Sequence, residues 1–130
     1  MVNCGHIYFL NLQLAGKPKL LVPAFIVPDG RVRFFVIGTN RTEYQQNTPE
    51  VAKHVLALPK KGHETCLTHD SWLACHEVVG GWRIGEIEAV ANCYRCPLDA
   101  AMVVAVRVLI LDTRLHSEID KAAILSQWPK

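Results

Sequence analysis

The sequence predicts a mainly β fold of the α+β class, a small barrel or sandwich flanked by short helices, one of them at the C-terminus. Short runs rich in Val, Ile, Phe and Tyr recur through the first 84 residues, with turns that contain Gly, Pro and Asn between them. Apolar residues at helical spacing appear only after this region. Because 50% of the 130 residues are hydrophobic, the chain has material for one core, and we expect a single domain over residues 1–130.

Three strands are expected in the first 38 residues, over 7–12, 20–27 and 32–37. Pro23 lacks the backbone N–H that the interior of a sheet requires, so the second strand should be an edge or bulged strand. The sequence Pro-Asp-Gly at 28–30 is typical of a turn between the second and third strands.

A polar stretch over 43–49 is expected to lead into two further strands. It is too long for a hairpin turn, and surface loops of this kind often carry binding groups. The fourth strand is predicted over 54–58. The fifth covers 72–79, is interrupted by the glycines at 80–81 and resumes at 82–84, which predicts a bent or bulged strand.

The last third of the chain has helical features. Apolar residues spaced by three and four predict a short helix over 86–94. The Val, Ile and Leu content of 100–111 favours a buried strand there, although its length and Asp99 near its start would also permit a buried helix. Ser117 is a good N-cap for a terminal helix that continues through Leu125.

The longest nearly unbroken apolar stretch is 100–111, which includes Arg107 and falls well short of the roughly 20 residues that cross a bilayer. We therefore expect no membrane partner. The first six residues lack the basic start and apolar middle of a secretory signal. The five cysteines, an odd number, are then expected to be reduced thiols in a cytoplasmic protein.

The net charge of +2 hides an uneven distribution. Residues 1–61 carry eight Lys and Arg against three acids, a net +5, whereas the remainder carries six bases against nine acids, a net −3. The N-terminal half therefore has a basic surface compatible with a polyanion such as RNA, the alternative being that these charges serve solubility.

Cysteines and histidines gather between residues 63 and 96. The pair Cys93-x-x-Cys96 could supply two corners of a zinc site, with Cys75 and Cys66 as the other thiolates. Cys75 and His76 are adjacent, however, and a strand sends neighbouring side chains to opposite faces. We therefore favour buried thiols and ordinary histidines, with no metal, and keep the zinc-stabilised module as an alternative.

The basic half has the groups needed to cleave RNA without a metal. Attack of a ribose 2′-hydroxyl on its own phosphate requires a nearby cation, a proton acceptor and a proton donor. Loops over 16–19 and 39–42 carry such groups, unless both are simply solvated turns. No P-loop, dinucleotide-binding motif or paired carboxylates are present, and no cofactor is expected. The candidate RNA-binding residues are Lys17, Lys19, Arg31, Arg33, Asn40 and Arg41.

Four segments together resemble the MazF/PemK toxin family. They are GHIYFLNL at 5–12, VPAFIV at 22–27, FVIGT at 35–39 and DSWLAC at 70–75. The family typically opens with Gly-Asp-Ile/Val-Tyr, continues with Arg-Pro-Val-Val-Ile and a strand that ends in Thr or Ser, and later has an Asp-Ser strand. The resemblance spans most of the chain through short motifs.

This resemblance implies an SH3-like barrel with flanking helices that forms a homodimer. The activity it implies is that of an endoribonuclease toxin acting on single-stranded RNA and neutralised by an antitoxin protein. Thr39 matches the catalytic Thr or Ser and Pro23 matches the proline of Arg-Pro, but Val22 stands at the position of the catalytic arginine and His6 at that of the acid.

Without that arginine the phosphate needs another cation. Loss of one stabilising donor costs on the order of 10² to 10³ in rate. Lys17, Lys19 or Arg41 are possible substitutes, and we take Thr39 and Lys19 as the catalytic candidates of an enzyme with weakened catalysis. The alternative from another class is a catalytically inert barrel that binds a protein partner.

Overall fold

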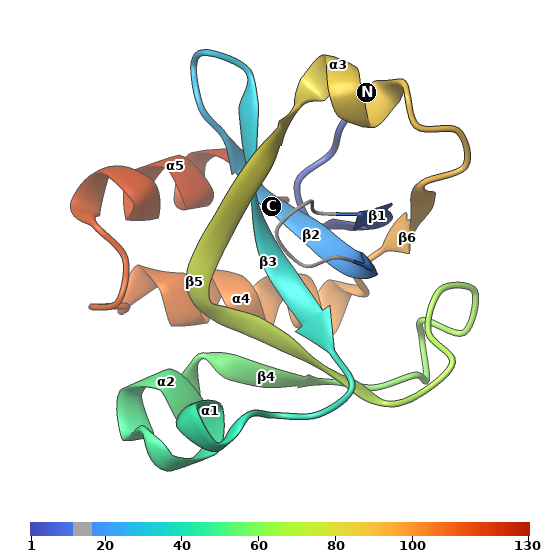
Figure 1. The fold of residues 1–130 in the computed structure, drawn as a ribbon. Helices are drawn as coiled ribbons and strands as arrows, with labels where there is room; N and C mark the ends of the chain where they lie inside the picture. The colour runs from blue at the N-terminus through green and yellow to red at the C-terminus, as the bar shows by residue number, and fades with distance from the viewer. Residues whose placement is uncertain (12–16) are drawn as a thin grey trace.

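Antiparallel strands form one sheet that curls into a half-barrel (Figure 1). The computed structural model describes residues 1–11 and 17–130, and within these six strands have the order β4-β5-β3-β2-β1-β6. The mainly β expectation is confirmed. The strands are β1 His6–Asn11, β2 Pro18–Ile26, β3 Arg31–Gly38, β4 Val55–Leu58, β5 Ser71–Arg83 and β6 Tyr94–Pro97.

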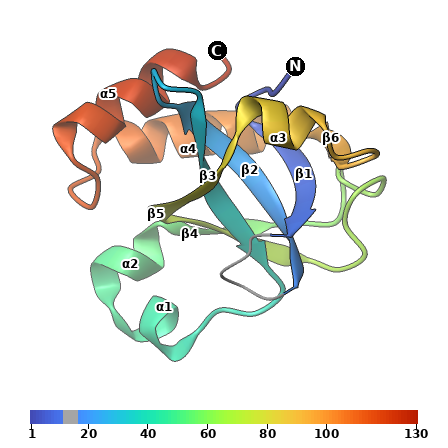
Figure 2. The same cartoon turned by 45° about the horizontal axis from the view of Figure 1, so that its top comes forward.

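Helices cover the sheet unequally. Figures 1 and 2 show α4 and α5 together on one side of the sheet, with α1 and α2 beyond the β4 edge. In the described residues the helices are α1 Glu43–Asn47, α2 Pro49–Lys53, α3 Ile84–Glu88, α4 Ala100–Leu111 and α5 Glu118–Gln127. None of these helices has the length and apolar character needed to cross a membrane.

Both faces of the sheet carry an apolar core, because successive side chains of a strand point to opposite faces. In β2, Val22 joins the cluster under α4 and α5, whereas Leu21 joins the cluster under α3. In β3, Phe35 and Phe34 divide in the same way. This double burial explains why β2 and β3 read as nearly continuous apolar runs rather than as alternating ones.

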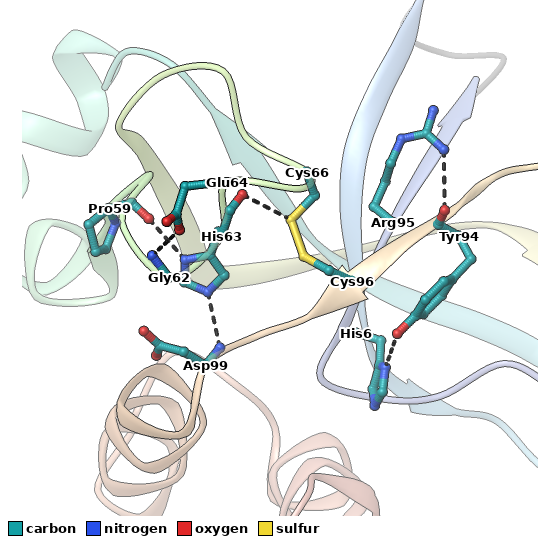
Figure 3. Close-up of a disulfide and its surroundings, with 10 residues drawn as sticks. All are labelled: His6, Pro59, Gly62, His63, Glu64, Cys66, Tyr94, Arg95, Cys96 and Asp99. Carbon is teal, nitrogen blue, oxygen red and sulfur yellow. Dashed lines mark hydrogen bonds between the residues drawn. A yellow bond between two sulfur atoms is a disulfide. The ribbon is translucent and has the colours of Figure 1, made fainter.

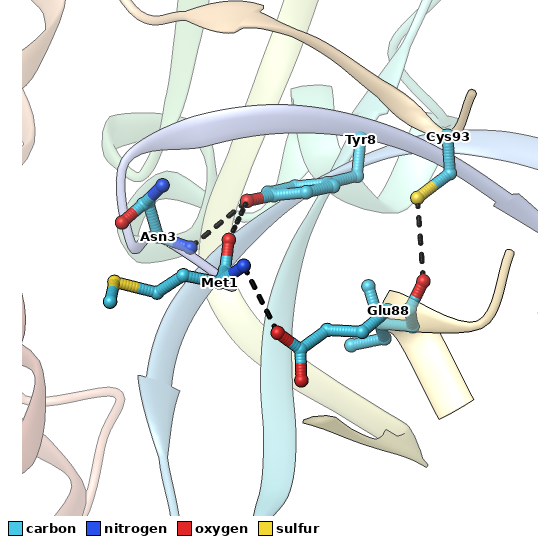
Figure 4. A network of polar contacts seen from close by, with 6 residues as sticks. Met1, Asn3, Tyr8, Glu88 and Cys93 are labelled. Atoms are coloured by element: carbon cyan, nitrogen blue, oxygen red, sulfur yellow. Dashed lines mark hydrogen bonds and ion pairs between the residues drawn. The ribbon is translucent and has the colours of Figure 1, made fainter. Parts of the chain in front are cut away.

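The chain segment before β1 is fastened to the α3 side of the sheet (Figure 4). The Met1 ammonium lies 3.0 Å from the Glu88 carboxylate, and the Asn3 N–H donates to the Tyr8 hydroxyl at 2.9 Å. The Cys93 thiol is buried in the same cluster and donates to the Ile87 carbonyl. These polar contacts hold the edge of the second core together.

The prediction of a strand over 100–111 is wrong, because this segment is helix α4. The Asp99 carboxylate caps it by accepting from the Met102 N–H at 2.8 Å. Met102, Val106 and Ile110, spaced by four, are its buried residues. Because the outward positions of the helix are also apolar, the periodicity that distinguishes helix from strand was hidden in the sequence.

Two other segments differ from expectation. The polar stretch 43–49 is not a loop but contains α1 and the start of α2, with a capping box between Thr42 and Gln45. The helix expected over 86–94 begins earlier and ends at Glu88. Asn92 then takes a left-handed conformation, with φ of 58°, and leads into β6, which the sequence had not indicated.

The expected strands are otherwise confirmed, with shifts at their ends. Pro23 lies in an interior strand, between β1 and β3, and the register with β3 shifts between Pro23 and Phe25, so the bulged alternative is the correct one. The Pro23 carbonyl accepts from the Gly5 N–H. β5 runs through Gly80, where the Arg33 side chain occupies the place of a Cβ. The Ser117 N-cap is confirmed.

Candidate nucleic-acid binding site

A pocket opens on the face of the sheet opposite α4 and α5, where β2, β3 and β5 lie beside α1. Its volume is about 210 Å³. The side chains that give it chemical character are Lys19, Asn40, Gln45, Trp72, His76 and Glu77.

Strand register brings these groups together. Gly38 pairs with Trp72, and Leu20 pairs with Ile37, so Lys19 is the next residue along β2 beside Gly38. Because Gly38 has no side chain, the floor between the lysine and the tryptophan stays open. Trp72, Ala74 and His76 alternate along β5 and therefore all face the pocket.

Arg41 lies over the Trp72 ring, with its guanidinium carbon 4.2 Å from the ring centroid. A guanidinium stacked on a ring keeps its in-plane N–H groups available to bind a phosphate in a bidentate way. Among residues 1–11 and 17–130, no carboxylate forms an ion pair with Arg41 and no acceptor takes a hydrogen bond from its side chain. The stacked guanidinium is therefore a preorganised anion-binding group beside the pocket.

His76 is the most unusual group of the site. Its side chain is only 8% exposed, and its Nδ1 is buried with no hydrogen-bond partner in the described part of the chain. Nε2 lies 3.6 Å from a Glu77 carboxylate oxygen. Burial lowers the pKa of His76, an effect that the Glu77 charge opposes and that His54 and His116 reinforce. The imidazole is therefore neutral at pH 7.

The two neighbouring histidines have structural partners. His54 Nε2 lies 2.6 Å from the Thr113 hydroxyl, and its Nδ1 lies 2.7 Å from the Glu50 carbonyl oxygen. His116 Nε2 donates to the Cys75 carbonyl at 2.7 Å. The His54 contact with Thr113 ties the α2–β4 connection to the α4–α5 connection, and the His116 contact ties the α4–α5 connection to β5.

The predicted cationic residues divide into two groups. Lys19 and Asn40 line the pocket and Arg41 adjoins it, whereas Lys17 is exposed just before β2. Of the loop expected over 16–19, Pro18 and Lys19 belong to β2, and residue 16 lies outside the described residues.

Arg31 and Arg33 lie toward the other end of β3. A strand rises about 3.3 Å per residue, so Arg31 is roughly 20 Å from Gly38. Arg31 pairs with Asp29 at 3.0 Å, and Arg33 lines a separate cavity beside α5. They therefore lie at the β2–β3 hairpin end, apart from the pocket that Lys19 lines, and their part in RNA binding stays a prediction.

Two positions from the family resemblance fall outside the pocket. Thr39 is exposed between Gly38 and Asn40, but the described residues that line the pocket do not include it. Val22, at the position of the expected arginine, is fully buried in the core under α4 and α5. An arginine there would point away from the pocket, so the guanidinium of this site comes from Arg41 instead.

The sequence analysis did not assign Trp72, His76 or Tyr44 to an RNA site. The Tyr44 ring packs edge-on to His76, with ring centroids 6.3 Å apart. The expectation that Cys75 and His76 point to opposite faces is confirmed, because Cys75 lies in the core and His76 lines the pocket. The same alternation places Trp72 and His76, four residues apart on one strand, on the same face of the sheet.

The expectation of reduced thiols is wrong for two of the five cysteines. Cys66 and Cys96 form a disulfide (Figure 3), although they are 30 residues apart in sequence. The loop that carries Cys66 is drawn toward the start of α4 by His63, whose Nε2 accepts from the Asp99 N–H at 3.0 Å. A proximity that depends on tertiary structure in this way leaves no local signal in the sequence.

The zinc alternative is also wrong. Its ligands Cys66 and Cys96 are bonded to each other, and Cys93 lies in the core opposite to that of Cys75. Across the described ranges, no three His, Cys, Asp or Glu side chains are arranged to hold a metal ion.

Comparison with known proteins gives no further guide to this site, because no family model and no curated protein matches the chain.

Proposed function

We propose that the protein is a metal-independent endoribonuclease of the MazF/PemK type that acts on single-stranded RNA at the pocket between Lys19 and Trp72. On this proposal the half-barrel is the SH3-like barrel of that family, the protein is a homodimer, and an antitoxin protein is its natural inhibitor. Of the segments that resemble the family, residues 6–11 form β1, which pairs with the β2 strand that carries Lys19, and residues 71–75 form the start of β5, which carries Trp72.

The observation that carries the proposal is the combination of groups around one pocket. Lys19 supplies a cation, Arg41 supplies guanidinium donors that no described acceptor occupies, and Trp72 supplies an aromatic surface. Single-stranded nucleic acids are bound by this combination of backbone cations and aromatic rings. His76 adds an imidazole that can accept a proton.

Besides these groups, the chemistry needs only a proton donor for the leaving oxygen, and water can serve as that donor. When the ribose 2′-hydroxyl attacks its own phosphate, negative charge builds up on the phosphate oxygens. The Lys19 ammonium and the Arg41 guanidinium stabilise that charge best when they are already in place. Thr39, exposed at the end of β3, is the hydroxyl that the family resemblance assigns to the reaction.

The test is cleavage of a labelled single-stranded RNA by the purified protein in the presence of EDTA. We expect cleavage with chelator, and a loss on the order of 10² to 10³ in rate for Lys19→Met. Lys121→Met, which removes one positive charge from α5 on the opposite side of the sheet, is the matched control and should keep near wild-type rates. A requirement for added metal, an inactive wild-type protein, or equal rates for the two variants would overturn the proposal.

A second candidate function is that of a catalytically inert barrel that binds a protein partner. The observation that favours it is an exposed apolar stripe on α4, formed by Val104, Val108 and Leu111. Growth arrest on expression separates the two candidates. The nuclease should stop growth and a neighbouring small gene product should relieve it, whereas the inert protein should not affect growth.

A further inference from the structure

His76 is a buried polar side chain that the fold itself does not explain. Buried polar atoms almost always have a hydrogen-bond partner, and those that lack one often belong to functional sites. His76 is more than nine-tenths buried, lines the pocket, and leaves Nδ1 without a partner among residues 1–11 and 17–130. The adjacent His54 and His116 differ in that each has a partner within the fold.

The surroundings of His76 select its tautomer. The Glu77 carboxylate, 3.6 Å from Nε2, favours the neutral form with its proton on Nε2. That tautomer leaves the lone pair on Nδ1, the atom without a partner. Nδ1 has almost no accessible surface, so a substrate hydroxyl must displace the side chains that cover this atom; once there, it meets a proton acceptor for which no described group competes.

We infer that His76 is the proton acceptor that activates the ribose 2′-hydroxyl of RNA bound at Lys19. This inference rests on the proposed ribonuclease function and extends it to a residue that neither the sequence nor the family resemblance indicated. The pocket places the imidazole on the same face of β5 as Trp72 and on the same pocket wall as Glu77.

Nδ1 takes the proton of the 2′-hydroxyl, and the 2′-oxygen forms a bond to phosphorus. The bond between phosphorus and the 5′-oxygen breaks, and the leaving oxygen keeps the electron pair and takes a proton from water. The resulting hydroxide removes the proton from the imidazolium. The products are a 2′,3′-cyclic phosphate and a 5′-hydroxyl, and His76 is regenerated.

Charged and titratable groups from several elements set the pH range of this step. Burial lowers the pKa of His76, Glu77 raises it, and His54 and His116 lower it. Lys19 from β2 lines the same pocket, and Tyr44 from α1 packs against the ring. Because the pKa lies below the ordinary value of 6.5, the base form is present at neutral pH and is lost as the pH falls below this range.

The experiment compares His76→Gln with His69→Gln, which removes an exposed histidine outside the pocket. Single-turnover cleavage of RNA and binding of the same sequence with 2′-O-methyl groups are both measured. We expect His76→Gln to cleave on the order of 10² to 10⁴ times more slowly, while its affinity for the 2′-O-methyl RNA changes by less than about threefold. The control should match the wild type in both measurements.

A second variant tests the idea if His76→Gln fails to fold. Glu77 is exposed at the pocket rim, with 67% of its side chain accessible, so Glu77→Gln should fold. Removal of its charge should move the acid side of the pH–rate profile to lower pH. The inference is overturned if this limb does not move, or if folded His76→Gln cleaves like the wild type.

The outcomes also separate this inference from the proposed function. If the wild-type protein neither binds nor cleaves RNA, the ribonuclease function itself is wrong, and the role of His76 falls with it. If Lys19→Met loses activity but His76→Gln does not, the function stands and another group accepts the proton.

Discussion

Arg41 and Trp72 form a stacked pair at the mouth of the pocket, with 4.2 Å between the guanidinium carbon and the ring centroid. Such a pair contributes about 0.5–1 kcal/mol at an exposed site. Its larger consequence is positional, since the contact holds the guanidinium, with its several N–H groups, beside the pocket. A lysine at this position would lack the flat guanidinium group and its paired N–H donors.

Arg41→Lys should therefore weaken RNA binding although the charge is kept. We expect a loss of about tenfold in affinity for the 2′-O-methyl RNA, measured by fluorescence anisotropy at fixed salt. Lys53→Arg, on exposed α2, makes the opposite exchange outside the pocket and should leave affinity unchanged. Equal affinities for Arg41→Lys and the wild type would show that the stacked guanidinium does not hold phosphate.

Trp72→Leu should also weaken binding, because an aromatic ring that stacks a base contributes about 1–3 kcal/mol. It also removes the ring that holds the Arg41 guanidinium in place. A double-mutant cycle with Arg41→Lys should then show non-additivity, with the double variant binding better than the sum of the single losses implies. Strict additivity would mean that the two side chains act independently.

The Cys66–Cys96 disulfide should contribute to stability through the loop it closes. For two cysteines 30 residues apart, the chain-entropy account gives about 3–4 kcal/mol. Urea unfolding with and without reductant should differ by about that amount. The double variant Cys66→Ser/Cys96→Ser should unfold at the same urea concentration in both conditions, and identical curves for the wild type would contradict the prediction.

Asp99 should stabilise α4 as its N-cap, because its carboxylate accepts from the Met102 N–H at 2.8 Å. Asp99→Ala should cost about 1 kcal/mol in the free energy of unfolding. Asp112, an acid at the other end of the same helix, interacts unfavourably with the helix dipole. Asp112→Ala should be neutral or slightly stabilising in the same urea titration, and an equal loss for both would argue against the cap.

Cys4 should react slowly with alkylating reagents. Burial raises the pKa of its thiol to about 11, so the reactive thiolate is scarce at pH 8. Mass spectrometry after iodoacetamide treatment should show little modification of Cys4 at pH 8 and more as the pH approaches 11. Full modification at pH 8 is expected only after unfolding in urea.

The strands were predictable because their β-branched and aromatic runs end at turn residues with a direct conformational role. Gly30, for example, has a φ of 90° in the β2–β3 turn. α4 was not predictable as a helix, because its exposed positions, including Val104 and Val108, are as apolar as its buried ones. α1 has no buried residue, so its sequence lacks the apolar face by which a helix is usually predicted.

Only the basic and polar residues of the candidate site were predictable from the sequence. Lys19, Asn40 and Arg41 were found because basic and polar residues in the expected loops suggest an anion. His76 lies in an apolar strand, and its lack of a hydrogen-bond partner is a property of its three-dimensional surroundings. From the sequence, Arg31 is as good a candidate as Arg41. The two lie apart because Arg31 begins β3 and Arg41 follows its other end.

Because side chains alternate along β5, the same strand supplies both the pocket and the core. Leu73 and Cys75 point into the core, and Trp72 and His76 point into the pocket. A shift of the β5 register by one residue would exchange these two sets. Substitutions at the pocket-facing positions of β5 can therefore change what the pocket binds and leave the core intact. A shift of the pocket by one residue along β5 would instead place core side chains in the pocket and disrupt the fold.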